Sequence, residues 1–300
     1  MTNLWSELFS FSNYGELLIL LRNSILAAAI LGLTGGLVGV FVMARDLPFA
    51  VHAISELSFA GAAAGLLFGI GVVEGSLAGS LTAAPLIGIL GSRARDRNSI
   101  IAVLMPFGLG LGIVCLSLYT GRAANKFGLL TGQIVAVDNP RLLSLVIICG
   151  IVIGALLVIW RPLMFVSVDP QVAEARGVRS VALSIAFMIL LGMATAVSVQ
   201  IVGALLVLSV LVTPAAAALR MSASPVLVPL LSTLFALAAM LGGILLAVGG
   251  SMPISPYVTT ISFACYVVCR VIGARRVRRG WGPRQGAARE TTDRPSRAIA

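Results

Sequence analysis

The sequence predicts an all-α protein, a polytopic transmembrane helical bundle of about eight or nine spans. Hydrophobic residues make up 59% of the 300 residues and charged residues only 11%, and the mean hydropathy is +1.05. A soluble domain carries about 25% charged residues. The apolar residues form continuous runs of about 20, the length that crosses a bilayer as a helix. Because these runs do not alternate with polar residues, they exclude a transmembrane β-barrel.

Nine apolar segments reach or approach this length, and short polar connections separate most of them. They are residues 17–43, 50–70, 74–91, 99–120, 142–160, 180–197, 200–219, 226–248 and 254–272. Only the stretch around Ser198–Gln200 divides the sixth from the seventh, so one of these two can be a half-span. Pro214 in the seventh predicts a kink, because proline has no amide hydrogen to donate within a helix.

Lysine and arginine are divided unevenly between alternate connections. One set, including the C-terminal tail, holds 17 of them and the other holds three. The positive-inside rule therefore predicts nine crossings with the C-terminus in the cytoplasm. We expect a transmembrane domain over residues 1–272 and a disordered basic tail over 273–300. A basic segment directly after a span is expected to contact anionic lipid, with no nucleic-acid partner.

Small residues four apart predict close helix contacts. They are Gly35 and Gly39; Gly61, Gly65 and Gly69; Gly75 and Gly79; and Gly150 and Gly154. The four cysteines all lie in apolar segments, where we expect them to act as small apolar side chains.

His52 and Glu56 are the candidate ion ligands. Ionisable residues within spans are costly, which makes them functional candidates. A spacing of four places the imidazole and the carboxylate on one helical face, where they could bind Zn²⁺ or Mn²⁺. The alternative is a local hydrogen bond between the two side chains, and the spacing alone does not decide between them.

A short polar helix is predicted on the arginine-rich side, between two spans. Asp169 can cap it, Pro170 suits its first position, and Gly177 can end it. Such a helix is a surface that can dock a partner, although an ordinary loop is the alternative. The single lysine, Lys126, lies in no P-loop pattern, so the chain is not expected to be an ATPase of that class.

The sequence resembles the permease family of zinc and manganese ABC importers, over residues 20–272. Four stretches carry the resemblance in order: residues 39–61, the segment 132–137 (GQIVAV), residues 168–177, and residues 202–218. The family's signature helix typically reads D-A-[IL]-S-H-[AS]. In this chain His52 stands where the acid is expected and Glu56 where the histidine is expected.

The resemblance implies an importer permease in a prokaryotic plasma membrane. It implies that His52 and Glu56 line the path of a transported Zn²⁺ or Mn²⁺, with no permanently bound cofactor. It also implies a helix that docks a separate ATPase and includes Asp169, Pro170, Ala173, Glu174 and Gly177. The expected partners are that ATPase, an extracytoplasmic metal-binding protein and a second permease chain, making a homodimer. A stand-alone secondary transporter or exporter is the alternative function.

Overall fold

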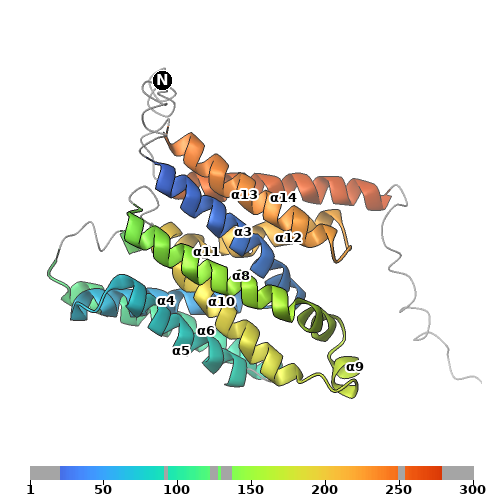
Figure 1. Cartoon of the computed structure of the whole chain (residues 1–300), viewed down its shortest axis with the longest axis horizontal. Coiled ribbons are helices and arrows are strands. Elements are labelled where there is room, and N and C mark those ends of the chain that lie inside the picture. The colour runs from blue at the N-terminus through green and yellow to red at the C-terminus, as the bar shows by residue number, and fades with distance from the viewer. Residues whose placement is uncertain (1–20, 91–93, 122–127, 130–136, 249–253, 279–300) are drawn as a thin grey trace, which may run out of the picture.

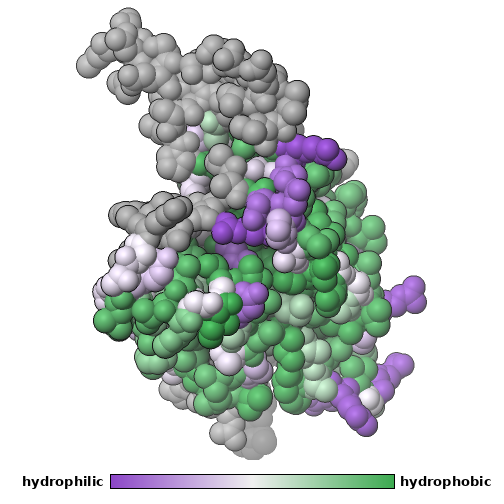
Figure 2. Space-filling view, turned by 60° about the vertical axis from the view of Figure 1, so that its left-hand side comes forward, coloured by the Kyte–Doolittle hydropathy of each residue, from purple (hydrophilic) through white to green (hydrophobic). Residues whose placement is uncertain are grey.

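The computed structural model describes residues 21–90, 94–121, 128–129, 137–248 and 254–278, and the regular structure of these residues is entirely helical (Figure 1). Eight of the described helices are long and apolar enough to cross a membrane, which confirms the predicted class. They are α3 (Arg22–Ala44), α4 (Pro48–Phe68), α5 (Val72–Leu90), α6 (Ala94–Leu118), α8 (Asn139–Val168), α10 (Ser180–Val202), α13 (Leu227–Val248) and α14 (Ile254–Arg278). Hydrophobic residues predominate in the coloured part of the face seen in Figure 2.

The seventh predicted span is broken into the short helices η2 (Ala204–Leu206), α11 (Val207–Leu211) and α12 (Thr213–Met221). The breaks fall at Gly203, where φ is +91°, and at Val212 between α11 and α12. The predicted kink is present as a break at Val212, two residues before Pro214. Pro214 itself lies in the first turn of α12, the helix that begins at Thr213, where its missing amide hydrogen costs nothing.

This broken segment returns the chain to the end of the bundle where α14 terminates. A Cβ added to Gly273, near the end of α14, would lie 2.4 Å from the carbonyl oxygen of Arg220 on α12. α14 continues to Arg278, beyond the predicted boundary at 272. The tail from 279 onward lies outside the described residues, so its predicted disorder stays a prediction.

Neighbouring helices approach the carbonyl groups near the break. The Ser262 hydroxyl of α14 donates to the Ser209 carbonyl at 3.0 Å. A Cβ added to Gly39 of α3 would lie only 2.0 Å from the Leu211 carbonyl oxygen. Only a glycine permits this approach, so the predicted role of Gly39 in close packing is confirmed.

Glycine also joins α4 to α5. A Cβ on Gly61 would lie 2.1 Å from the Gly75 carbonyl oxygen, and a Cβ on Gly75 would lie 2.2 Å from that of Gly61. No other helix of the chain makes the predicted close approach at Gly150 and Gly154 of α8, because no described atom lies within 4 Å of a Cβ at either position.

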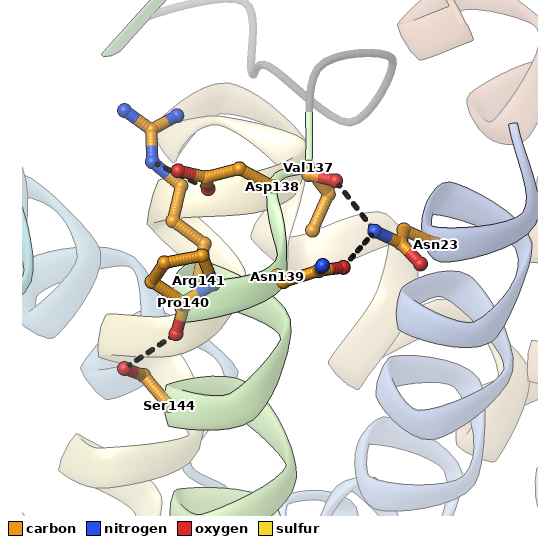
Figure 3. A network of polar contacts seen from close by, with 7 residues as sticks. All are labelled: Asn23, Val137, Asp138, Asn139, Pro140, Arg141 and Ser144. Atoms are coloured by element: carbon orange, nitrogen blue, oxygen red, sulfur yellow. Dashed lines mark hydrogen bonds and ion pairs between the residues drawn. The ribbon is translucent and has the colours of Figure 1, made fainter. Parts of the chain in front are cut away.

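At one end of the bundle, side chains join the start of α3 to the start of α8 (Figure 3). The Asn23 side-chain amide donates to Asn139 Oδ1 at 2.8 Å and to the Val137 carbonyl at 3.3 Å. Arg141 pairs with Asp138 at 3.5 Å. Arg45 lies at the other end of the bundle, where α3 ends. Arg45 and Arg141 are thus at opposite ends, as expected for residues in the arginine-rich and arginine-poor sets of connections.

Candidate functional site

α4 carries both candidate ion ligands well inside the bundle. The helix begins at Pro48, and Glu56 lies about 12 Å along it at 1.5 Å per residue. At about 100° per residue, His52 and Glu56 occupy the face opposite Gly61 and Gly65. Since those glycines contact α5, the ligand face is directed away from α5.

The structure brings the two side chains together without a full hydrogen bond. His52 Nε2 lies 3.8 Å from Glu56 Oε1, longer than the usual 2.7–3.2 Å range. The Glu56 side chain is 5% exposed and the His52 side chain 26% exposed. This geometry does not support a simple local hydrogen bond as the reason for the pair.

Two atoms of the pair have no hydrogen-bond partner although they are buried: Glu56 Oε2 and His52 Nδ1. Leaving such polar groups unsatisfied costs roughly 1–3 kcal/mol each, and more for a charged group. A carboxylate oxygen and an imidazole nitrogen are both donors to transition metals. The arrangement is therefore open to a cation that can bond to these atoms.

The other polar groups of α4 are used within the protein. The Ser55 hydroxyl donates to the His52 carbonyl at 2.8 Å. On a different face, Ser58 Oγ lies 2.7 Å from Ser76 Oγ, and Ser76 donates to the Ala196 carbonyl at 3.1 Å. This buried serine seam joins α4, α5 and α10. It was missed from the sequence, where the only signal was serine within apolar spans.

The described residues contain no group of three or more His, Cys, Asp or Glu side chains that could hold a metal ion. Cys265 and Cys269 are free thiols on α14. Within this part of the chain, His52 and Glu56 therefore have no third such side chain beside them.

The predicted polar helix is present as α9 (Pro170–Ala175), beside the start of α10 (Figure 1). Asp169 Oδ1 accepts a hydrogen bond from the Val172 amide at 3.0 Å, which confirms the predicted cap. Gly177 follows the helix with φ +80°. Ala173 is fully buried and holds α9 against the bundle, whereas Glu174 is exposed and accepts a hydrogen bond from the Ser180 hydroxyl.

Of the four motif stretches, three lie in the structure as α4 with the end of α3, as α9, and as the broken segment after α10. The GQIVAV stretch, residues 132–137, lies almost entirely outside the described residues. The structure therefore does not test this part of the resemblance.

Curated relatives include membrane proteins of manganese and zinc transport systems. The chain is 33% identical over 230 residues to the manganese import system permease protein ScaB of Streptococcus pneumoniae, covering 74% of this chain and 80% of that one. It is 28% identical over 224 residues to the manganese transport system membrane protein MntC of Listeria monocytogenes, with the same coverage. It is 24% identical over 246 residues to the high-affinity zinc uptake system membrane protein ZnuB of Haemophilus influenzae, covering 82% and 94%.

Solved structures share the fold. PsaBC from Streptococcus pneumoniae, in complex with Fab, superposes with a TM-score of 0.75 at 23% identity, covering 83% of this chain and 90% of that one. An inward-facing putative metal-chelate type ABC transporter superposes with a TM-score of 0.69 at 18% identity, covering 84% and 85%. The model of the ABC 3 transport family matches residues 18–273. The chain is thus a multi-pass membrane protein that belongs to the ABC 3 transport family.

Proposed function

We propose that this chain is the membrane-spanning permease of an ATP-driven importer for Mn²⁺ or Zn²⁺, in which His52 and Glu56 line the ion path. One observation carries the proposal: Glu56 Oε2 is buried in a membrane-spanning helix without a hydrogen-bond partner, beside an imidazole 3.8 Å from the other carboxylate oxygen. A buried carboxylate is retained in a span at a cost. A passing divalent cation would offset that cost.

The chemistry of the pair suits both metals named for the relatives. Imidazole favours Zn²⁺, whereas carboxylate oxygen is the donor that Mn²⁺ accepts readily. With only two side-chain donors, the remaining coordination is left to water, main-chain carbonyls or a second permease chain. The ion is cargo in this mechanism, and no resident cofactor is required.

The partners follow from the same proposal. The chain has no P-loop lysine pattern, so ATP hydrolysis belongs to a separate ATPase. We place that ATPase on the exposed residues of α9, including Pro170 and Glu174. An extracytoplasmic binding protein delivers the metal at the arginine-poor end, and a second copy of the permease completes the complex.

The orientation rests on charge. The loops at the end that includes α9 hold most of the arginines, and the basic tail follows α14. This end is therefore placed in the cytoplasm of a prokaryotic cell, against the plasma membrane's anionic lipid.

The test is metal uptake by proteoliposomes that contain the permease and its ATPase, supplied with loaded binding protein. We expect ⁵⁴Mn²⁺ or ⁶⁵Zn²⁺ to enter only with ATP. Uptake driven by a proton gradient without ATPase would establish the secondary carrier instead. If ATP-dependent uptake is unchanged in both Glu56→Gln and His52→Ala, the two residues do not line the ion path.

A further inference from the structure

A cavity of about 540 Å³ lies between α9 and the rest of the bundle at the arginine-rich end. The turn between α3 and α4, the ends of α5 and α8, and the beginning of α10 form its other walls. Six polar residues line it: two are Asp46 and Ser167, and the other four are Arg45, Glu174, Ser180 and Ser184. The apolar Phe187 lies beside them on α10.

These four polar residues form an unbroken series of contacts from α9 to the α3–α4 turn. The Ser180 hydroxyl donates to Glu174 Oε1. The Ser184 hydroxyl donates to the Ser180 carbonyl at 2.8 Å. Arg45 Nη2 donates to the Ser184 hydroxyl oxygen. We call this series the Arg45 relay.

Arg45 also meets α10 at a second point, one turn further along. Its guanidinium carbon lies 5.8 Å from the centre of the Phe187 ring, within range of a cation–π contact. Phe187 is fully buried and packs against Phe41 of α3 with ring centres 5.9 Å apart. The arginine is therefore attached to α10 both by a hydrogen bond and by an aromatic face.

The turn that carries Arg45 leads directly into the ion-binding helix. The Leu47 amide donates to the Val42 carbonyl at 2.9 Å, and Asp46 has φ +55°, a left-handed conformation. This tight turn ends at Pro48, the first residue of α4. A displacement of Arg45 would reach His52 and Glu56 along a continuous helix, because such rigid elements carry coupling between sites.

We infer that Arg45 is a positioning residue that transmits movement of the ATPase-docking helix α9 to the helix carrying His52 and Glu56. This inference rests on the proposed function. When the ATPase displaces α9, the start of α10 moves with it, and Arg45 draws the beginning of α4 in the same direction. The cavity gives these elements room to move, which a close-packed interior would deny them.

Two substitutions remove the contact between Arg45 and Ser184, one from each side. Ser184→Ala removes the acceptor of the arginine. Arg45→Met keeps a long side chain over Phe187 and removes the donor. Ser167→Ala is the matched control, because Ser167 lines the same cavity but its hydroxyl donates to the Leu163 carbonyl of its own helix, at 2.6 Å.

The first measurement is metal imported per ATP hydrolysed, in proteoliposomes that contain the permease, its ATPase and loaded binding protein. A coupling free energy in the usual range corresponds to a change of about 5-fold or more. We expect each relay variant to lower the ratio by about that factor while ATP hydrolysis continues, and Ser167→Ala to keep the wild-type ratio. Arg45→Lys, which retains a donor, should restore part of the ratio.

The second measurement does not depend on the metal. Hydrogen exchange of the α4 amides over residues 51–56 is compared with and without ATP. We expect ATP to change this exchange in the wild type and in Ser167→Ala, but not in the relay variants. Wild-type ratios and wild-type exchange responses in both Ser184→Ala and Arg45→Met would overturn the inference. A wild-type complex whose α4 responds to ATP but which imports neither metal would instead overturn the proposed function.

Discussion

Replacing Glu56 by glutamine should lower transport without lowering stability. The substitution preserves the size of the side chain and removes its charge. In the structure, Glu56 Oε2 is buried without a partner and Oε1 lies 3.8 Å from His52 Nε2. If the charge of Glu56 serves folding, the substitution should lower stability and leave uptake normal. If the charge serves ion binding, the substitution should lower uptake and leave stability intact.

The stability effect can be estimated from that distance. At this distance His52 Nε2 makes no hydrogen bond to the carboxylate, and the imidazole is an opposite charge only when it is protonated. The buried carboxylate thus loses hydration without a close partner to offset the loss, so its net contribution to folding is near zero or unfavourable. Glu56→Gln should therefore leave the free energy of unfolding unchanged or raise it by about 1–3 kcal/mol.

The transport effect has the opposite sign. Removing one partner of a buried charge pair costs about 3–5 kcal/mol when the other charge remains. The remaining charge in this case is the divalent cation. At 1.4 kcal/mol per factor of ten, uptake at subsaturating metal should fall by about 100-fold or more.

The assay is initial uptake of ⁵⁴Mn²⁺ and ⁶⁵Zn²⁺ per correctly inserted molecule, together with the thermal unfolding midpoint in detergent. Glu74→Gln is the matched control, because Glu74 is exposed in the first turn of α5. It should leave uptake unchanged. Normal uptake with a lowered unfolding midpoint in Glu56→Gln would refute the reasoning and identify a structural pair.

Three further predictions follow from the packing and the charge pattern. Gly39→Ala should abolish stable insertion, because the added Cβ would lie 2.0 Å from a carbonyl oxygen of α11. Gly154→Ala should leave stability unchanged, and unfolding midpoints in detergent would check both outcomes. Gly177 has a left-handed backbone conformation, so Gly177→Ala should lower the free energy of unfolding by about 1 kcal/mol. It should also weaken copurification of the ATPase, and full copurification would contradict the docking role of α9. A reporter fused after Ala300 should be active only as a cytoplasmic reporter, and periplasmic activity would reverse the orientation.

The sequence predicted the spans because lipid imposes a length and a composition on every crossing helix. It predicted an interruption near Pro214 but not its exact position at Val212, since a proline disfavours helix in the residues before it without fixing the last helical residue. It predicted close packing at Gly61, Gly75 and Gly150, but not that Gly61 and Gly75 would face each other or that no helix of the chain would approach Gly150. A small-residue pattern permits close approach, and only the fold determines which helix is beside it.

The same distinction applies to the candidate site. The four-residue spacing sufficed to place His52 and Glu56 together, because helix geometry is local. The unsatisfied carboxylate oxygen could not be predicted, since it depends on what all neighbouring helices leave unbonded. The contact of Arg45 with Ser184 was equally inaccessible, because 139 residues separate the two in the chain.

The order of the two ligands along α4 bears on which ion the path releases. His52 lies four residues closer than Glu56 to the arginine-rich end, about 6 Å along the axis, and it is the more exposed of the two. In the proposed direction of import, an ion meets the carboxylate first and the imidazole last. Zn²⁺ would bind the final nitrogen donor more firmly than Mn²⁺ would. Since a transporter must release its cargo, this order favours the turnover of Mn²⁺ over that of Zn²⁺ even where both ions bind.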